Sequence, residues 1–315
     1  MNKNRSIAFT LFEGDYEYGV GVWINSLIDN AFVGRIVVGY RNALPFWINQ
    51  LEKNEDNYYS IKRFSEIQLE FRRIDFNHHL RYYKPFLFEE LLEEYPDANI
   101  YYFDPDITVI GDWQFFEEWI EYGVCLCLDD CYSIMPFSHP HKQKWLKLFP
   151  VNPENINYRY DYYINSGFVG ANKNHESLIK EWKKFILHLI SHSHNLKKFG
   201  PTQGRFKKSI RLEDIGGDQD ILNAVLCANK TEVSLIGREG MGFIPGEYLM
   251  MHNTGIKTWR KNFLKEFIRK GIRVSSSDKS YLHYSFCPIN IYPNRWTFRS
   301  KNLNKNLTLL LQRVF

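Results

Sequence analysis

Apolar runs separated by polar and turn residues recur along the chain at intervals typical of an α/β protein. Short continuous apolar runs predict buried strands over 6–12, 35–40, 68–74, 99–103 and 124–128. Apolar positions repeating every three or four residues predict helices over 20–28, from 44–49, and over 81–94, 177–190 and 218–227. This alternation predicts an α/β fold with a mostly parallel, Rossmann-like sheet flanked by helices.

Acidic pairs follow two of the predicted strands. The fourth stops at Asp104-Pro105-Asp106, since proline cannot donate to a strand ladder, and the fifth ends in Asp129-Asp130. Open α/β sheets bind ligands beyond the carboxyl ends of their strands. Two carboxylates one residue apart suit Mg²⁺ or Mn²⁺ shared with phosphate oxygens, and the alternative for such a pair is a solvated turn.

Two further clusters lie downstream. The segment GGDQDILN (216–223) has glycines that permit close backbone approach to a ligand, and a helix whose first turn would project Asp218 and Gln219. The alternative is an ordinary acidic first turn. The segment MHNTGIKTW (251–259) combines His252, a suitable Mn²⁺ ligand, with a glycine and a lysine that could carry a diphosphate, although a lone histidine is more often structural.

Composition and charge narrow the class of protein. The 315 residues are 24% charged and 44% hydrophobic, which excludes a disordered, collagen-like or coiled-coil chain. Residues 1–250 carry a net charge of −7, whereas residues 251–315 carry thirteen Lys and Arg against two Asp and Glu. We therefore expect two parts, a domain over 1–255 and a basic, aromatic-rich extension over 256–315.

The basic extension has two interpretations of equal weight. Residues 259–274 have the pattern of a basic amphipathic helix. The extension could pack on the domain with a solvated basic face, or dock on an anionic membrane surface. No nucleic-acid-binding motif is present, so we expect no nucleic-acid partner.

Other features of the sequence bear on the cellular compartment of the protein. The sequence has no signal-peptide pattern and no apolar run long enough to span a membrane. Five cysteines, an odd number, favour reduced thiols in a cytoplasm. Cys125, Cys127 and Cys131 could form half a zinc site, but buried side chains on a strand are favoured. The polar, basic segment 192–210 predicts a mobile loop.

Taken in order, the clusters resemble the GT-A glycosyltransferases, most closely the retaining family 8 type that includes bacterial lipooligosaccharide galactosyltransferases and glycogenin. The resemblance spans roughly residues 6–260. The matching pieces are TLFEGDYEY (10–18), Ser26-Leu27, RYYKP (81–85), YYFDPDI (101–107), Asn165-Ser166-Gly167, DQDILN (218–223) and HNTGIKTW (252–259). The last piece departs from the family pattern, because Thr258 replaces a proline and one residue is missing between Gly255 and Lys257.

The resemblance implies a role for each matched residue. Asp104, Asp106 and His252 would bind Mn²⁺ or Mg²⁺ bridging the donor diphosphate, and Gln219, with Asp218, would act near the anomeric carbon. The other implied donor-binding residues are Asp15 with Tyr16 or Tyr18 at the uracil or ribose, Arg81 and Lys84 at the sugar or phosphate, Gly255 and Lys257 at the diphosphate, and Asn165, Gly167, Asp218 and Asp220 around the sugar.

The implied activity is transfer of a hexose from a UDP-sugar to a surface glycan or lipid-linked acceptor, in the cytoplasm or on the inner face of its membrane. The family implies retention of configuration. Inversion stays open, because it requires a carboxylate base and Asp218, Asp220 and Asp130 are available.

Two other functions compete. One is a phosphohydrolase of the haloacid dehalogenase type, with Asp104 as nucleophile and Asp106 as acid/base, since the segment also reads DxDxT. The other is a non-catalytic carbohydrate-binding, membrane-docking protein that uses the 17% aromatic content.

Overall fold

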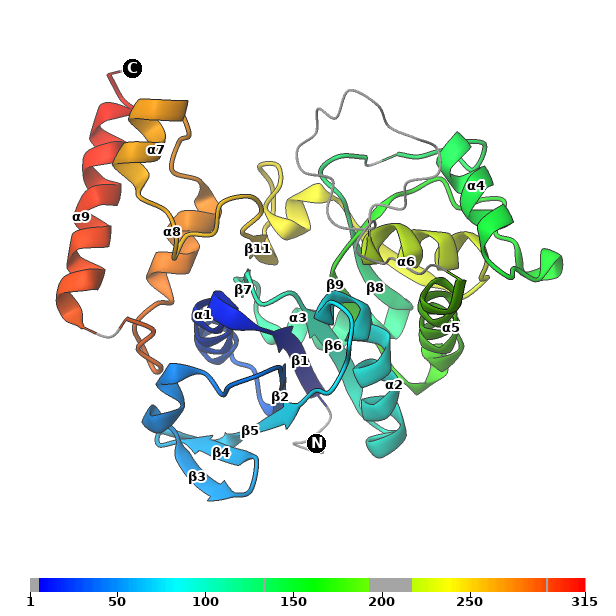
Figure 1. The fold of residues 1–315 in the computed structure, drawn as a ribbon, viewed down its shortest axis with the longest axis horizontal. Coiled ribbons are helices and arrows are strands. Elements are labelled where there is room, and N and C mark those ends of the chain that lie inside the picture. Colours follow the sequence, from blue (N-terminus) through cyan, green and yellow to red (C-terminus); the bar gives the residue numbers. More distant parts are fainter. Residues whose placement is uncertain (1–5, 133, 193–216, 293, 315) are drawn as a thin grey trace.

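The computed structural model describes residues 6–132, 134–192, 217–292 and 294–314. Its centre is a nine-stranded sheet of order β10-β8-β9-β6-β1-β2-β5-β4-β3 (Figure 1). The strands are β1 (Ser6–Phe12), β2 (Gly34–Tyr40), β3 (Glu52–Glu55), β4 (Tyr58–Ile61), β5 (Phe64–Arg73), β6 (Asn99–Phe103), β8 (Val124–Leu128), β9 (Ile164–Ala171) and β10 (Val233–Ile236). A separate pair consists of β7 (Ile107–Val109) and β11 (Met250–His252).

Strand direction brings several strand ends to one edge. β1, β2, β5 and β6 run parallel. β9 lies antiparallel between β6 and β8, so β8 points the same way as β6. The carboxyl ends of β1, β6 and β8 therefore meet at the same edge of the sheet, where an open α/β sheet places its ligand site.

Helices cover both faces of this sheet. They are α1 (Glu17–Asp29), α2 (Lys84–Glu94), α3 (Trp113–Trp119), α4 (Pro140–Leu148), α5 (Glu176–His192) and α6 (Asp218–Cys227). Three more helices, α7 (Phe263–Lys270), α8 (Ser276–His283) and α9 (Arg295–Leu311), lie at one side of the molecule (Figure 1). Side chains alternate along each strand, so Ala8 and Phe12 of β1 join one hydrophobic cluster, with α1 and α3. Ile7 and Phe9 join the other, with α2, α5 and α6.

The predicted fold class is confirmed, with a large, mostly parallel sheet flanked by helices. The strands predicted over 6–12, 99–103 and 124–128 and the helix over 218–227 coincide with β1, β6, β8 and α6. The helix predicted from 44–49 was wrong in type, because this stretch forms only a 3₁₀ segment, Phe46–Gln50. The loop predicted over 192–210 lies outside the described residues, apart from residue 192 at the end of α5.

The predicted helix over 259–274 is shorter in the structure. It begins at Phe263, after Asn262 accepts a hydrogen bond from the Lys265 backbone N–H, and ends at Lys270. Gly271 follows with φ +66°, a left-handed conformation that stops the helix. The residues before Asn262 lie in turns, which brings them to the site described below.

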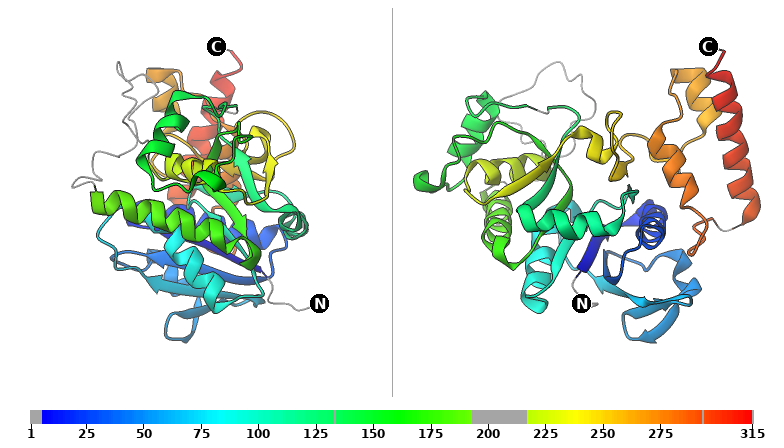
Figure 2. Two further views of the ribbon diagram at one scale, coloured as in Figure 1. Left: turned by 90° about the vertical axis from the view of Figure 1, so that its right-hand side faces the viewer. Right: turned by 180° about the vertical axis from the view of Figure 1, so that it is seen from behind.

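Residues 256–315 share the core of the main sheet. α7, α8 and α9 gather on the side of the molecule opposite α5 (Figure 1, Figure 2). Phe263, Tyr281 and Ile291 belong to the same hydrophobic cluster as α1. Asn25 of α1 reinforces this contact, since its amide donates to the Ile289 carbonyl and accepts from the Ile289 N–H. Among the described residues, no helix has the length and apolar character needed to span a bilayer.

Candidate active site

A cavity of about 1180 Å³ opens at the sheet edge where β1, β6 and β8 end. Its lining includes residues that directly follow these strands: Glu13 after β1, Asp104 after β6, and Asp129 and Asp130 after β8. The first turn of α6 and the loop after β11 complete it. The cavity thus lies at the place predicted from the acidic strand ends.

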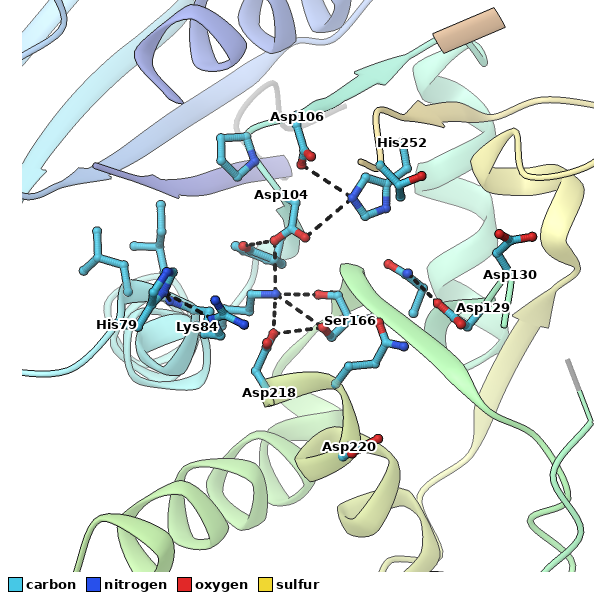
Figure 3. Close-up of a pocket in the computed structure, with 18 of the residues that line it drawn as sticks. His79, Lys84, Asp104, Asp106, Asp129, Asp130, Ser166, Asp218, Asp220 and His252 are labelled. Atoms are coloured by element: carbon cyan, nitrogen blue, oxygen red, sulfur yellow. Dashed lines mark hydrogen bonds and ion pairs between the residues drawn. The ribbon is translucent and has the colours of Figure 1, made fainter. Parts of the chain in front are cut away.

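Two carboxylates and an imidazole meet in this cavity (Figure 3). Asp104 and Asp106 lie in the loop between β6 and β7, and His252 ends β11. The antiparallel pairing of β11 with β7 sets His252 opposite Ile107, beside Asp106. His252 Nε2 lies 3.5 Å from Asp106 Oδ1 and 3.8 Å from Asp104 Oδ2. The three residues offer ligand atoms that all lie within 4.8 Å of one another.

Each of these carboxylates has one oxygen held by a lysine and the other near His252. Lys84 Nζ lies 3.1 Å from Asp104 Oδ1, and Lys257 Nζ donates to Asp106 Oδ2. The remaining oxygens, Asp104 Oδ2 and Asp106 Oδ1, are the ones that lie nearest His252 Nε2. Two carboxylate oxygens and one imidazole nitrogen form a donor set suited to Mn²⁺ or Mg²⁺.

The backbone of β9 leaves room for such an ion. A Cβ added to Gly167 would lie 2.8 Å from His252 Cε1 and 3.0 Å from Asp104 Oδ2. Any larger residue at this position would therefore push into the space between the ligands. The donor set and this cradle together fit a divalent cation, and the identity of the ion is not fixed by them.

Electrostatics keep Asp106 ionised. Burial opposes ionisation of this carboxyl, but Lys257 and His252 outweigh burial and hold its pKa well below the usual range. Burial likewise opposes the charge on Lys257, yet Asp106 raises the pKa of that ammonium. The carboxylate is therefore charged, as a metal ligand must be, over the whole physiological pH range.

Lys84 bridges a candidate metal ligand, Asp104, and the first residue of α6, Asp218. Its ammonium is almost fully buried and lies 2.6 Å from Asp218 Oδ2 as well as 3.1 Å from Asp104 Oδ1. It also donates to the Ser166 carbonyl oxygen at 2.9 Å. Burial alone would lower the pKa of Lys84, but Asp104 and Asp218 raise it, and Lys84 with Arg81 lowers the pKa of Asp218 despite burial.

The side chains predicted to surround a sugar lie next to this cluster. Asp218 accepts a hydrogen bond from Ser166 Oγ at 2.8 Å, and Gln219 Oε1 accepts one from the Ser166 N–H at 3.3 Å. Asn165 donates to Asp129 at 2.8 Å. Gly217, with φ +120°, turns the chain into α6 so that Asp218 and Gln219 point to the cavity.

Asp15 and Tyr16 line the end of the cavity beyond Lys257. Trp259 Nε1 donates to Asp15 Oδ2 at 2.9 Å, and Arg260 pairs with the same carboxylate. Arg260 is the main reason why the pKa of Asp15 is lowered. The Tyr16 ring packs edge-on against Trp259, with Lys257 Nζ 5.7 Å from the centre of the Tyr16 ring.

Most of the residues singled out in the sequence meet in this one cavity. Tyr18 does not line it: its ring packs on Phe46, 5.1 Å away, and it borders a smaller hollow next to α9. Gly167 lies behind the ligand side chains rather than on the surface. The predicted residues that line the cavity are Asp15, Tyr16, Arg81, Lys84, Asp104, Asp106, Asn165, Asp218, Gln219, Asp220, His252, Gly255 and Lys257.

Sequence reasoning missed a second set of lining residues. They are Glu13, His79, Tyr132, Met135, His141, Trp145, Tyr163 and Arg260. Five of them, Tyr132, Met135, His141, Trp145 and Tyr163, belong to the stretch 131–163 after β8, which is rich in Tyr, His and Pro. That composition was a usable signal for a binding loop, but it does not tell which of its many aromatic residues face inward.

The cysteines do not form the alternative zinc site. Cys125 and Cys127 are buried on β8, where burial raises the pKa of both thiols, whereas Cys131 is exposed. A zinc ligand must be a thiolate. Among the described residues, Asp104, Asp106 and His252 are the only group of three or more His, Cys, Asp and Glu side chains placed to hold a metal ion.

Comparison with known proteins gives a structural likeness without a sequence match. No model of a known protein family and no curated protein matches the sequence. Over 97% of the chain, the structure resembles the bifunctional glycosyltransferase WbbM (TM-score 0.54, 15% identity). Over 95% it resembles the glycosyltransferase GlyE of Streptococcus pneumoniae TIGR4 (TM-score 0.52, 15% identity). The chain spans only 52% of the length of the WbbM chain and 64% of that of GlyE.

A third solved structure is similar over nearly the whole length of both chains. The galactosyltransferase LgtC, crystallised with donor and acceptor sugar analogs, is similar over 94% of this chain and 99% of its own (TM-score 0.51, 12% identity). The expected resemblance to GT-A glycosyltransferases of the family 8 type is confirmed at the level of the fold.

Proposed function

We propose that the protein is a metal-dependent glycosyltransferase that transfers a hexose from a UDP-sugar to a glycan or lipid-linked acceptor. The observation that carries the proposal is the arrangement of Asp104 and Asp106, each with one oxygen on a lysine and the other near His252. This arrangement lies in a cavity at the ligand-binding edge of a glycosyltransferase fold.

The chain's own residues supply most of what the reaction needs. Tyr16 and Asp15 would hold the nucleoside, and Lys257 would move from Asp106 toward the diphosphate. Asn165 and Asp218 would hold sugar hydroxyls. A divalent cation held by Asp104, Asp106 and His252 would neutralise charge that develops on the departing diphosphate.

The chemical step exchanges one bond at the anomeric carbon for another. The bond to the diphosphate oxygen breaks, its electron pair stays on the diphosphate, and the acceptor hydroxyl oxygen bonds to the carbon. The proton of that hydroxyl passes to the departing diphosphate. Gln219, oriented by the Ser166 N–H, would stabilise the positive charge on the sugar during this exchange.

We propose retention of configuration because two of the three carboxylates that could act as the base of an inverting reaction, Asp218 and Asp220, are held by hydrogen-bond donors. Asp218 is bound to Lys84 and Ser166, and its lowered pKa makes it reluctant to take a proton. Asp220 accepts a hydrogen bond from Tyr163 OH at 2.6 Å. Proton NMR of the product's anomeric centre decides the question: inverted configuration would refute retention while leaving the transferase proposal intact.

The decisive experiment for the function is a screen of UDP-, GDP- and CMP-sugars with Mn²⁺, Mg²⁺ or EDTA. We expect UDP and its sugars to raise the Tm only with a divalent cation, because a ligand that binds only the folded state stabilises it. We also expect UDP release under the same conditions. Release of inorganic phosphate from phosphomonoesters, with no nucleotide-sugar turnover, would support the phosphohydrolase instead.

We further propose a cytoplasmic enzyme that associates peripherally with the inner face of the membrane. All five cysteines are thiols, which suits a reducing compartment. α9 exposes an apolar stripe with arginines beside it, which suits an anionic leaflet. The test of this association is given at the end of the Discussion.

A further inference from the structure

The cavity ends in an aromatic wall on the side away from Lys84. Four rings line it: Tyr132, His141 and Trp145 from the stretch after β8, and Tyr163 just before β9. In Figure 3, Asp129 and Asp130 mark this side, across the cavity from His79 and Lys84. None of the four was assigned to donor or metal binding above.

These rings form one connected group. Tyr163 lies 5.5 Å from Tyr132 and 6.3 Å from Trp145, and His141 lies 6.3 Å from Trp145, measured between ring centres. Trp145 and Tyr163 are buried, so the inner part of the wall is fixed by packing, whereas Tyr132 is 42% exposed. Rings that are held firmly and open on one side offer a flat apolar surface to a ligand.

Hydrogen bonding fixes the wall further. Tyr163 OH donates to Asp220 Oδ1 at 2.6 Å, and burial together with Asp220 raises the pKa of Tyr163, so this phenol stays protonated. Asp129 accepts hydrogen bonds from Asn165 Nδ2 and from the Cys131 N–H, both at 2.8 Å. The side chains of Tyr163 and Asp129 are therefore held in place by hydrogen bonds at this end of the cavity.

The charge at this end is negative. Asp129, Asp130 and Asp220 line it, whereas the lysines and arginines among the described lining residues, Arg81, Lys84, Lys257 and Arg260, belong to the donor side. Lys142, also on α4, turns away to donate to the Tyr160 carbonyl and is fully buried. A negatively charged ligand placed here would meet repulsion, whereas hydroxyl groups would find acceptors.

We propose that the aromatic wall binds an uncharged sugar ring of the acceptor, with its C–H face on Tyr132, the exposed ring of the wall, and its hydroxyls toward Asp129 and Asp130. This inference rests on the proposed glycosyltransferase function, and it names the acceptor class for that site. Sugars whose recognised ring carries a carboxylate or phosphate are excluded. The acceptor hydroxyl would then face Gln219, whose side chain contacts the Ser166 N–H, next to Lys84, and Tyr163 of the wall.

The test compares Tyr132→Ala with Tyr132→Phe, which keeps the ring. Tyr122→Ala is the matched control, because Tyr122 is 74% exposed and lies outside the cavity. The probes are the methyl β-glycosides of glucose, galactose and N-acetylglucosamine, against the methyl glycosides of glucuronic and sialic acid. Two quantities are measured: acceptor KM, and metal-dependent hydrolysis of the UDP-sugar in the absence of acceptor.

We expect at least one neutral glycoside to bind and no charged one. Tyr132→Ala should raise the acceptor KM about fivefold or more, whereas Tyr132→Phe and Tyr122→Ala should not, and donor hydrolysis should be unchanged in all three. Saturation-transfer NMR should show C–H protons of the neutral glycoside in contact with the wild-type protein, and a weaker effect in Tyr132→Ala.

Contrary outcomes separate the two proposals. Donor hydrolysis with an unchanged acceptor KM in Tyr132→Ala, or a preference for the charged glycosides, would overturn the aromatic subsite and leave the proposed function standing. Wild-type protein that hydrolyses no UDP-sugar with any divalent cation would overturn the proposed function itself.

Discussion

At Lys84, a buried ammonium group contacts two carboxylates that have different tasks. Asp104 is a candidate metal ligand, and Asp218 lies beside the position proposed for the sugar. The Lys84 ammonium also lies 4.7 Å from the centre of the Tyr102 ring. A buried charge is costly without a partner. Loss of one of these carboxylates would therefore change how strongly Lys84 pairs with the other.

The first prediction concerns Asp218 and pH. Its pKa is lowered in the folded protein, so its contribution to stability is present above the unfolded value of about 4 and is lost as the pH falls. Asp218→Asn should lower the free energy of unfolding by about 2 kcal/mol at pH 7. The difference from wild type should shrink below about pH 4. Urea unfolding between pH 3 and 7 measures it, and a gap that stays constant with pH would contradict the ion-pair explanation.

The second prediction concerns Asp106, a candidate metal ligand. Asp106→Asn keeps the size of the side chain but removes the charge that a divalent cation and Lys257 require. We expect Mn²⁺-dependent UDP release to fall by at least about a hundredfold while the protein remains folded. Asp56→Asn is the control. Asp56 lies in the turn between β3 and β4, its side chain is 97% exposed, and it does not line the cavity. Activity of Asp106→Asn equal to that of the control would rule out Asp106 as a ligand.

At the scale of elements, the site depends on a strand pair, β7 and β11, that the sequence pattern did not predict. β7 and β11 are three residues each, too short for periodicity to distinguish them from loops. Yet their antiparallel pairing brings His252 to Asp106. The sequence-based expectation that these residues share a site came from the family resemblance, since no local pattern encodes contact between segments so far apart.

Longer elements were more predictable, and for physical reasons. After Asn99, β6 is apolar because it is central and buried on both faces, and Pro105 marks its end. α8 escaped prediction because its sequence SSDKSYLH is mostly polar. The Ser275–Asp278 capping box starts this helix, and the buried Asp278 carboxylate pairs with Lys261 and accepts a hydrogen bond from Thr258.

The third prediction concerns Gly167 of β9, which leaves space beside the candidate metal ligands Asp104 and His252. In Gly167→Ala the three atoms nearest the new methyl group are side-chain ends, Asn165 Oδ1, His252 Cε1 and Asp104 Oδ2, so we expect the strand to stay while the ligands move. We expect the protein to fold and its Mn²⁺ affinity to drop about tenfold or more, measured by electron paramagnetic resonance of free Mn²⁺.

Gly271→Ala provides the matched control for this prediction. Gly271 has φ +66° and open space around it, so alanine there should cost about 1 kcal/mol of stability. It lies at the end of α7, outside the cavity lining, so Mn²⁺ affinity should not change. Equal Mn²⁺ affinity in both variants would show that Gly167 does not shape the ion site.

At the scale of the whole molecule, some of the basic residues in 251–315 line the cavity and others hold the extension together. Lys257 and Arg260 line the cavity, and Lys261 pairs with buried Asp278. Lys301 donates to the backbone carbonyls of Trp259 and Lys261, and burial lowers its pKa to about 8. Lys257 and Arg260 attach the extension to the rest of the chain, which favours the packing interpretation for its inner face.

The outer face of α9 has no such partner among the described residues. Trp296, Leu303, Leu307 and Leu310 are 43–76% exposed and follow one another at helical spacing along a single stripe. Arg295 and Arg299 are exposed beside it, and the Arg299 guanidinium lies 5.8 Å from the centre of the Trp296 ring. Apolar side chains flanked by arginines suit insertion among anionic headgroups, where each basic residue contributes about 1 kcal/mol.

The fourth prediction tests this face without removing α7–α9, since truncation near residue 260 would strip Tyr281 and Ile291 from the core. The triple variant Trp296→Ser, Leu303→Ser, Leu310→Ser should co-sediment about tenfold less than wild type with phosphatidylglycerol-containing vesicles, and neither should bind pure phosphatidylcholine. UDP release without vesicles should be equal in both, because α9 lies outside the cavity lining. Leu187→Ser, which changes an exposed leucine on α5, is the control. Equal sedimentation of the triple variant and wild type would remove the membrane role and leave α9 as a solvated outer helix.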